Sequence, residues 1–160
     1  MSTSGQRTRS AWEDRFRTPT YEDLRDQCNK QVAGVFDTAR TRLGAIPGVR
    51  ESLTWLGIPW RWSLEYRLAL DPARAWAVLV LQPNRPIIAV PIPSPVLARI
   101  QVARLPRSIR EGLRAAPPVA GVFWPAWECT SKTLVDEVVN VLDLKRSVIA
   151  ELPLSNGTNS

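Results

Sequence analysis

The residues Trp60-Arg61-Trp62-Ser63-Leu64-Glu65-Tyr66-Arg67-Leu68 decide the fold class, because apolar and polar side chains alternate along them without a break. Successive side chains of a β-strand point to opposite faces of the sheet. The alternation therefore predicts a half-buried strand, with the tryptophans on one face and arginine, serine and glutamate on the other.

The two stretches that follow this strand complete a small meander. Turn residues at Asp71-Pro72-Ala73 lead into an apolar run from Ala75 to Leu81, which is typical of a strand buried on both faces. A second turn at 82–86 precedes a third strand over 87–92. Strands joined by short turns pair antiparallel, so we expect an antiparallel sheet whose third strand leaves it at the prolines of 91–95.

Two helices are expected before the first strand. Thr20 and the acids after it resemble a capping box, and apolar residues then recur at helical spacing until Gly44. Pro47 suits the first turn of a second, shorter helix over 47–57, in which Val49 and Leu53 share one face. We therefore predict helix in both segments.

The second half of the chain alternates helix signals with one strand signal. We predict helices over 95–103 and 106–115, a fourth strand over 119–128, and a long last helix capped by Thr130 or Ser131. The order predicts an α+β fold with a small antiparallel sheet of about four strands and helices packed mainly on one face.

Length and composition predict one domain. A chain of 160 residues with 44% apolar residues can bury a single core. We expect one domain over 18–152, with a disordered N-terminal arm at 1–17 and a disordered tail at 153–160, because both ends are polar and lack periodicity.

The residues that are missing exclude several kinds of chemistry. The chain has no histidine, which excludes Ser-His-Asp and Cys-His catalysis and imidazole zinc sites. Two cysteines, Cys28 and Cys129, are too few for a disulfide scaffold or a thiolate zinc site. We therefore expect no metal and no cofactor, and a reduced cytoplasmic setting without membrane contact, because no apolar run is long enough to span a bilayer.

Tryptophan is the first candidate for function. Six of the seven tryptophans lie between Trp55 and Trp127, and four of these are candidates for a ligand site: Trp60, Trp62, Trp124 and Trp127. Indole rings bury much surface and also make good walls for a ligand pocket, so the cluster is either core or a binding groove. Glu65 and Arg67 lie on the same predicted strand and complete the candidate ligand site.

Arginine is the second candidate. The net charge is +6, and the excess lies in the middle of the chain. Arg107, Arg110 and Arg114 repeat at spacings of three and four, which predicts a cationic stripe on one helix face. The stripe is a solvated surface or an anion-binding site, and the polar strand face with Arg61, Glu65 and Arg67 has the same two interpretations.

Part of the chain resembles a known family. The segment Glu51-Ser-Leu-Thr-Trp-Leu-Gly-Ile-Pro-Trp60, the strand and turn after it, the helix at Leu105-Pro106 and the C-terminal helix resemble the small YdhG-like domains over roughly 45–150. The resemblance implies an α+β domain with no assigned activity. Some members are considered frataxin-like iron chaperones, which need an acidic ridge, and this chain departs from them because its middle is cationic. No functional residue is transferred.

Three functions remain open on these residues. The first is a non-enzymatic cytoplasmic binding domain that uses the tryptophans and nearby arginines to hold a small organic anion or a partner protein. The second is an enzyme that uses Glu65 or Glu128 as an acid or base in an aromatic pocket. The third is a nucleic-acid-binding protein, which requires the arginines between 61 and 114 to converge on one face.

Overall fold

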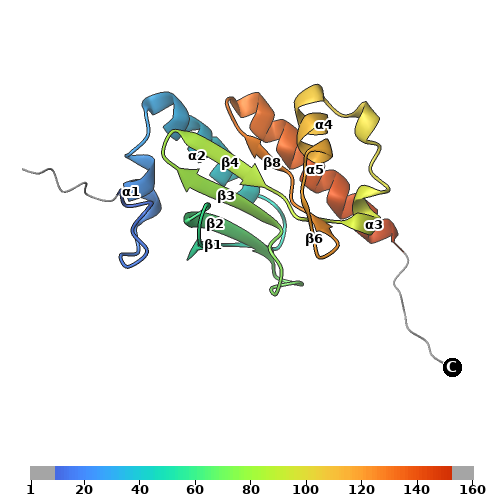
Figure 1. The fold of residues 1–160 in the computed structure, drawn as a ribbon, viewed down its shortest axis with the longest axis horizontal. Coiled ribbons are helices and arrows are strands. Elements are labelled where there is room, and N and C mark those ends of the chain that lie inside the picture. Colours follow the sequence, from blue (N-terminus) through green and yellow to red (C-terminus); the bar gives the residue numbers. More distant parts are fainter. Residues whose placement is uncertain (1–9, 153–160) are drawn as a thin grey trace, which may run out of the picture.

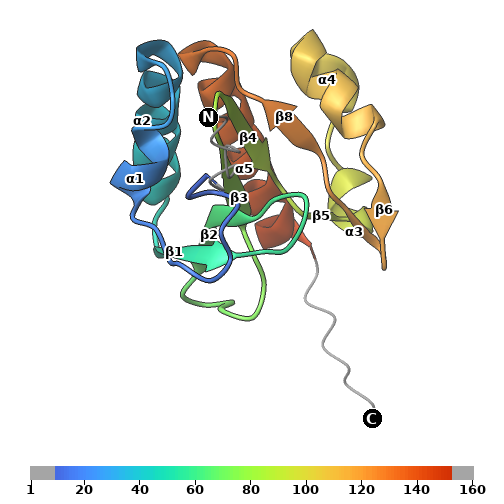
Figure 2. The same ribbon diagram turned by 60° about the vertical axis from the view of Figure 1, so that its left-hand side comes forward.

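A computed structural model describes residues 10–152 and shows a mixed α+β fold. Its main sheet has five antiparallel strands in the order β1-β2-β3-β4-β8. The strands are β1 (Val49–Trp55), β2 (Trp62–Leu68), β3 (Ala77–Gln82), β4 (Arg85–Ala89) and β8 (Ala126–Glu128). Helices α2 (Lys30–Gly44) and α5 (Lys132–Glu151) contact each other and lie on one face of this sheet (Figures 1 and 2).

The predicted fold class is confirmed, and so are the predicted starts of the first and last helices. Thr20 forms a capping box with Asp23 at the start of α1 (Tyr21–Arg25). Asn29 caps α2, so the first predicted helix is divided into α1 and α2. Ser131 caps α5 by accepting a hydrogen bond from the Leu134 backbone N–H.

The predicted helix over 47–57 is wrong. Residues 49–55 form β1, which pairs with β2 along its whole length from Val49 opposite Leu68 to Trp55 opposite Trp62. Val49, Leu53 and Leu56 are spaced for a helix, but Val49, Leu53 and Trp55 also alternate as in a strand. Pairing with the strongly alternating β2 therefore favours the strand, and the sheet gains a fifth member.

The remaining elements form a smaller unit beside β8. A short strand β5 (Ile92–Pro93) leads into α3 (Ser94–Leu97), a 3-10 turn η1 (Val102–Arg104) and α4 (Arg107–Arg114). Strands β6 (Pro118–Val119) and β7 (Val122–Phe123) form a hairpin that pairs with β5 in a second, three-stranded sheet. The segment predicted as one strand over 119–128 is thus three short strands.

The main core lies between the sheet and the two long helices. Tyr66 and Leu79 on the sheet, Phe36 on α2 and Leu142 on α5 are almost fully buried in it. The burial extends to both faces of β2, where five consecutive residues from Trp62 to Tyr66 are buried, so the predicted half-buried strand is wrong in this respect. None of the described helices is long and apolar enough to cross a membrane.

The segment from residue 10 to the start of α1 is part of the folded domain. Trp12 is only 7% exposed and donates its indole N–H to the Trp62 carbonyl over 3.1 Å. Trp62 in turn donates its indole N–H to the Asp14 carbonyl over 2.8 Å. The expected disorder of the arm therefore does not apply to residues 10–17, while residues 1–9 and 153–160 lie outside the described part of the chain.

Candidate functional site

The structure separates the four candidate tryptophans into core and surface. Trp62 is 6% exposed and Trp127 is 4% exposed. Trp62 is held by the arm through Trp12 and Asp14, and Trp127 packs its indole ring against Gly112 on α4. These two rings therefore cannot receive a ligand without unfolding part of the domain.

Trp60 and Trp124 form a contact pair at the surface. Their ring centroids are 5.7 Å apart with an interplanar angle of 58°, and both residues are half-buried. Trp60 lies in the loop between β1 and β2, whereas Trp124 lies just before β8. Because β1 and β8 are the two edge strands of the main sheet, the pair joins segments from its opposite edges. Tilted indole pairs at this distance are mutually stabilising.

Two exposed aliphatic side chains lie on the chain segments that carry the pair. Ile58, two residues before Trp60, is 80% exposed. Val119 is 58% exposed on β6, which pairs with β7 immediately before Trp124. We name Ile58, Trp60, Val119 and Trp124 the Trp60–Trp124 surface. Each of its two loops contains a residue in the left-handed backbone conformation, Arg61 at φ 55° and Ala120 at φ 50°. This conformation is uncommon for residues other than glycine.

Glu65 and Arg67 do not form the solvated or anion-binding face that the sequence predicts. Glu65 is 6% exposed, and Ser63 beside it is fully buried with its hydroxyl donating to the Trp60 carbonyl. This face of β2 is therefore shielded from solvent at both residues. Arg67 donates to the Glu65 carboxylate and to the Pro72 carbonyl, so its guanidinium is already occupied.

The arginine stripe on α4 is present but is not a uniform cationic face. Arg107 forms an ion pair with Glu111 over 2.9 Å, one turn later on the same helix. Arg110 is half-buried, and its Nε has no hydrogen-bond partner among the described residues. Arg114 is exposed. One of the three guanidinium groups of the stripe is thus paired with a carboxylate of its own helix.

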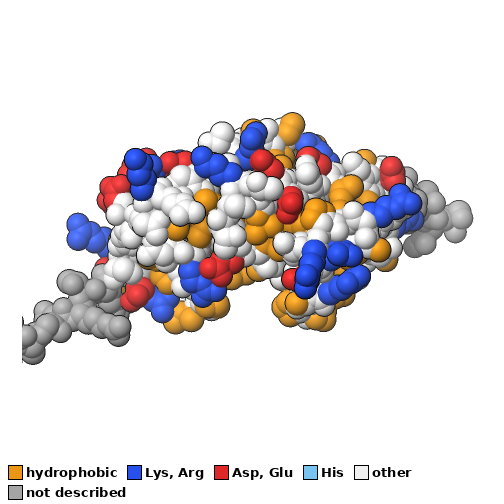
Figure 3. Space-filling view, turned by 90° about the horizontal axis from the view of Figure 1, so that it is seen from above, with side chains coloured by type: hydrophobic (Ala, Val, Ile, Leu, Met, Phe, Trp, Pro, Cys, Tyr) orange, Lys and Arg blue, Asp and Glu red, His pale blue; other side chains and the backbone are white. Residues whose placement is uncertain are grey.

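The other arginines are also spread among separate partners. Arg61 lies over the Trp12 ring and 3.7 Å from the Glu13 carboxylate, and Arg85 pairs with Glu128 over 3.1 Å. Figure 3 shows the same pattern on one face of the molecule, where basic side chains stand in separate groups with acidic side chains between several of them. On the face shown in Figure 3, the basic side chains therefore do not form one uninterrupted surface.

A polar network that the sequence did not predict ties four elements together. The Tyr66 hydroxyl donates to Glu51 on β1 over 2.7 Å, and Arg40 of α2 donates to the same carboxylate over 2.9 Å. Burial, followed by the bond to Glu51, raises the pKa of Tyr66 well above its usual range. The phenol therefore stays protonated and acts only as a donor.

The same network continues to α1. The Arg40 guanidinium lies 4.3 Å above the Tyr21 ring, and Tyr21 donates to Asp37 over 2.8 Å. Arg25 also donates to Asp37, which lowers the pKa of that carboxyl. Each carboxylate already has two donors, so the network is a structural tie between α1, α2, β1 and β2. The bonded residues are 11 to 16 positions apart in the sequence, and neither helical nor strand periodicity relates residues so far apart. The sequence therefore did not predict this network.

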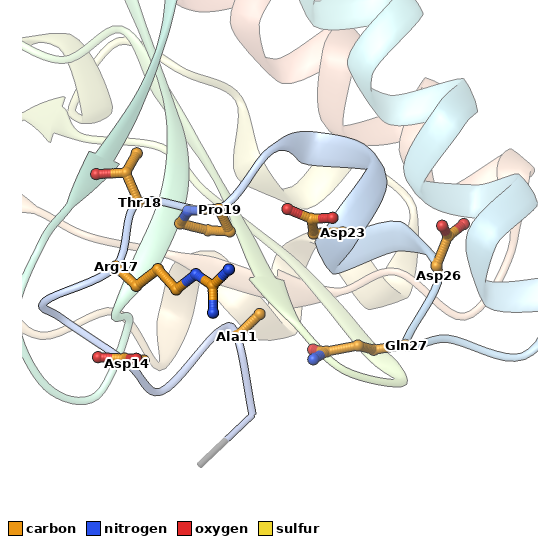
Figure 4. A pocket seen from close by; sticks show the side chains of 8 residues that line it. All are labelled: Ala11, Asp14, Arg17, Thr18, Pro19, Asp23, Asp26 and Gln27. Atoms are coloured by element: carbon orange, nitrogen blue, oxygen red, sulfur yellow. The ribbon is translucent and has the colours of Figure 1, made fainter. Parts of the chain in front are cut away.

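Two surface cavities have linings that contain no tryptophan. The first, of about 410 Å³, is bordered by the arm and α1; Asp14, Asp23 and Asp26 line it, and Arg17 points toward its middle (Figure 4). The second, of about 320 Å³, lies between η1 and the end of α5. Neither cavity is lined by a tryptophan, Glu65 or Glu128, so neither matches the predicted aromatic pocket.

The cysteines and acids show no reactive or metal-binding arrangement within residues 10–152. Both cysteines are free, and burial raises the pKa of the Cys129 thiol to about 12. A thiol with such a pKa is almost entirely protonated at neutral pH and is a poor nucleophile. In the described part of the chain, no group of three His, Cys, Asp or Glu residues is placed to hold a metal ion.

Comparison of the chain with known proteins gives no similar protein from which a function could be inferred. No protein-family model matches the chain, and neither a curated protein nor a solved structure matches it. The resemblance to YdhG-like domains stays a prediction. The function must therefore be argued from the residues themselves.

Proposed function

We propose that this protein is a non-enzymatic binding domain that holds a partner protein through the Trp60–Trp124 surface. The observation that supports this most directly is the exposure of Ile58 and Val119, at 80% and 58%, on the two chain segments that carry a half-buried tryptophan pair. Solvent-exposed apolar groups that gather in one place on a soluble domain are typical of interaction sites.

The chemistry of the surface suits a protein partner. Tryptophan is enriched among the residues that contribute most to binding energy at protein interfaces. Here each ring is held in place by the other, so little side-chain entropy is lost when a partner covers them. Ile58 and Val119 at the periphery would exclude water from the indoles.

A small organic anion is supported less well. The two described cavities do not include the tryptophans, and Arg67 is held by Glu65 and Pro72. An anion at the Trp60–Trp124 surface would therefore have a flat platform without a cationic partner. We prefer the partner protein for this reason.

The enzyme and nucleic-acid alternatives also find little support. Glu65 is buried against Arg67, and Glu128 is paired with Arg85 at the edge of the sheet. An acid or base that serves a substrate must have access to it. The arginines are dispersed, whereas a nucleic-acid surface needs them together. We place the domain in the cytoplasm, because its two cysteines are free.

The test compares two surface variants with a matched control. Ile58→Lys and Val119→Lys each put a charge into the Trp60–Trp124 surface at a side chain that carries no core packing. Leu70→Lys is the control, because Leu70 is 99% exposed in the β2–β3 turn, outside this surface. All three should keep the melting temperature of the wild type.

The readout is quantitative affinity capture from an extract of the source cells, followed by binding titration of the captured protein. We expect the same partner on the wild type and on Leu70→Lys, and at least tenfold weaker binding to Ile58→Lys and Val119→Lys, as an interface charge without a partner costs more than 1.4 kcal/mol. Equal binding to all four proteins would refute the proposal. If no protein is captured and organic anions raise the melting temperature of the wild type, the binding partner is a small ligand instead of a protein.

A further inference from the structure

The second surface cavity lies between two walls of different origin. One wall is formed by residues within 99–105, the segment that joins α3 to α4 through η1, beside the C-terminal part of α5 (Figure 1). The other wall is α5 itself, where Leu144, Ser147, Val148 and Glu151 line the cavity. These positions are spaced by three, four and seven residues from the first, so they share one face of the helix. We name this space the η1–α5 cavity.

Short-range hydrogen bonds fix the first wall in the absence of any ligand. The Ile100 backbone N–H donates to the Leu97 carbonyl over 3.1 Å, and the Arg104 N–H donates to the Gln101 carbonyl over 3.0 Å. Such i to i+3 bonds make tight 3-10 turns. A wall that is already ordered loses little conformational entropy when a ligand binds.

Both walls present apolar side chains to the cavity. Ile100 and Leu105 line it from the first wall, and Leu144 and Val148 line it from α5. Leu144 is 38% exposed, although it lies on the same helix face as the half-buried Val148. Ligand sites are typically concave surfaces with apolar lining and a few polar groups. The volume of about 320 Å³ has room for roughly ten non-hydrogen atoms at about 30 Å³ each.

The charged residues of the cavity have no ionic partner within residues 10–152. Arg99 and Arg104 both line the cavity and are exposed, and neither forms an ion pair in this part of the chain. Glu151 also lines it and is likewise unpaired there. Two guanidinium groups therefore stand against one carboxylate beside an apolar surface. A guanidinium can bind a carboxylate through two parallel hydrogen bonds.

We propose that the η1–α5 cavity binds a small aliphatic carboxylate of about ten non-hydrogen atoms. The tail contacts the apolar side chains of both walls, and the carboxylate binds Arg99 and Arg104. An organic cation with the same tail would meet two like charges, and a short carboxylate would bury too little apolar surface. Charge and apolar lining together thus select this class of ligand.

The probe for this proposal is octanoate, which has ten non-hydrogen atoms, in isothermal titration calorimetry with the full chain. We expect a Kd between about 10 µM and 1 mM, which is ordinary for a ligand of this size. Octylammonium carries the same tail with the opposite charge and should bind at least about tenfold more weakly. Butyrate keeps the carboxylate but has four fewer methylenes, and it should also bind at least about tenfold more weakly.

Two variants of α5 locate the site. Leu144→Glu places a carboxylate inside the cavity, and we expect octanoate to bind at least about tenfold more weakly to it. Ile149→Glu is the matched control, because Ile149 is 41% exposed on the same helix but does not line the cavity. Both variants should keep the wild-type melting temperature, and Ile149→Glu should keep the wild-type Kd.

A second pair of variants tests the cationic groups. Arg104→Gln removes one guanidinium from the cavity, and we expect a Kd for octanoate about fivefold higher than that of the wild type. Arg114→Gln removes an exposed guanidinium of α4 that does not line the cavity, so its Kd should be unchanged.

The variant Ile58→Lys separates this proposal from the proposed function. It alters the Trp60–Trp124 surface and should bind octanoate as the wild type does, because Ile58 does not line the cavity. Loss of octanoate binding in Ile58→Lys would move the ligand to that surface and overturn the proposal.

Three further results would also overturn it. Equal binding of octanoate and octylammonium would show apolar contact without recognition of the carboxylate. Wild-type affinity in Leu144→Glu would place the site elsewhere. No heat of binding up to about 10 mM octanoate would leave the cavity to an apolar segment of another protein.

Discussion

Gly112 shows how a single residue determines the packing of a helix. It lies in the middle of α4, where glycine is unfavourable, yet a Cβ at this position would overlap the indole ring of Trp127. The missing side chain allows α4 to approach β8 closely enough to bury that ring. The sequence predicted helix here but gave no reason for the glycine.

This close approach leads to a prediction about Gly112→Ala. Alanine favours a helix by about 1 kcal/mol, but the overlap with Trp127 forces a shift that costs more. We expect the variant to lose about 2 kcal/mol of unfolding free energy in urea denaturation. Gly34→Ala is the control, since a Cβ at Gly34 of α2 has no neighbour within 4 Å, and it should gain up to about 1 kcal/mol. A stabilised Gly112→Ala would show that α4 can move freely.

At the scale of elements, α5 carries a charged residue on its core face. Lys145 follows Val138, Val141 and Leu142 at helical spacing, and it is 3% exposed. Its ammonium lies 4.0 Å from the centroid of the Trp76 ring, at the start of β3. Burial lowers the pKa of Lys145 to about 7, although Asp71 acts in the opposite direction. Ile149, seven residues after Leu142 on the same helix, is by contrast 41% exposed.

The lowered pKa predicts a pH dependence of stability. Between pH 7 and the ordinary lysine pKa of 10.5, the unfolded chain binds more protons than the folded one, so Lys145 makes stability rise with pH. In Lys145→Met this contribution is absent. We therefore compare the unfolding free energies of Lys145→Met and the wild type by urea denaturation. The value for the variant minus the value for the wild type should fall by about 2 kcal/mol from pH 7 to pH 9.

Arg146→Met is the matched control for this pH dependence. Arg146 is exposed on the same helix, and arginine does not titrate in this interval. Its stability should therefore follow the wild type at both pH values. If the difference in unfolding free energy between Lys145→Met and the wild type stayed constant with pH, Lys145 would have an ordinary lysine pKa. Its ammonium group would then have to reach water.

At the scale of the whole molecule, the segment before α1 completes the core. Trp12 donates its indole N–H to the Trp62 carbonyl, and Trp62 donates its own to the Asp14 carbonyl. Trp55 meets Trp62 edge-on with centroids 5.6 Å apart. Residues from the arm, β1 and β2 thus form one aromatic cluster. This segment is part of the fold although its composition is typical of a disordered end.

Removal of the Trp12 side chain tests this role. We expect Trp12→Ala to lower the unfolding free energy by about 3 kcal/mol, because the ring is almost fully buried. Phe16→Ala in the same arm is the control, since Phe16 is 86% exposed and should change stability by less than about 0.5 kcal/mol. Equal stability of the two variants would mean that the arm is not docked in solution.

The sequence by itself determined what depends on neighbours along the chain. Alternation in β2, the apolar run of β3 and the caps at Thr20 and Ser131 each predicted their elements, because local periodicity and capping act within a few residues. The α+β class followed from the order of these elements. The absence of histidine excluded whole classes of chemistry without any structure.

Only the tertiary structure decided which residues face solvent. The segment 49–55 fits both periods, and pairing with β2 made it a strand. Glu65 is buried although its place in the alternation predicts exposure, and Trp60 and Trp124 lie at the surface while Trp62 and Trp127 lie in the core. These outcomes depend on partners that are distant in sequence, and a pattern of neighbouring residues does not contain that information.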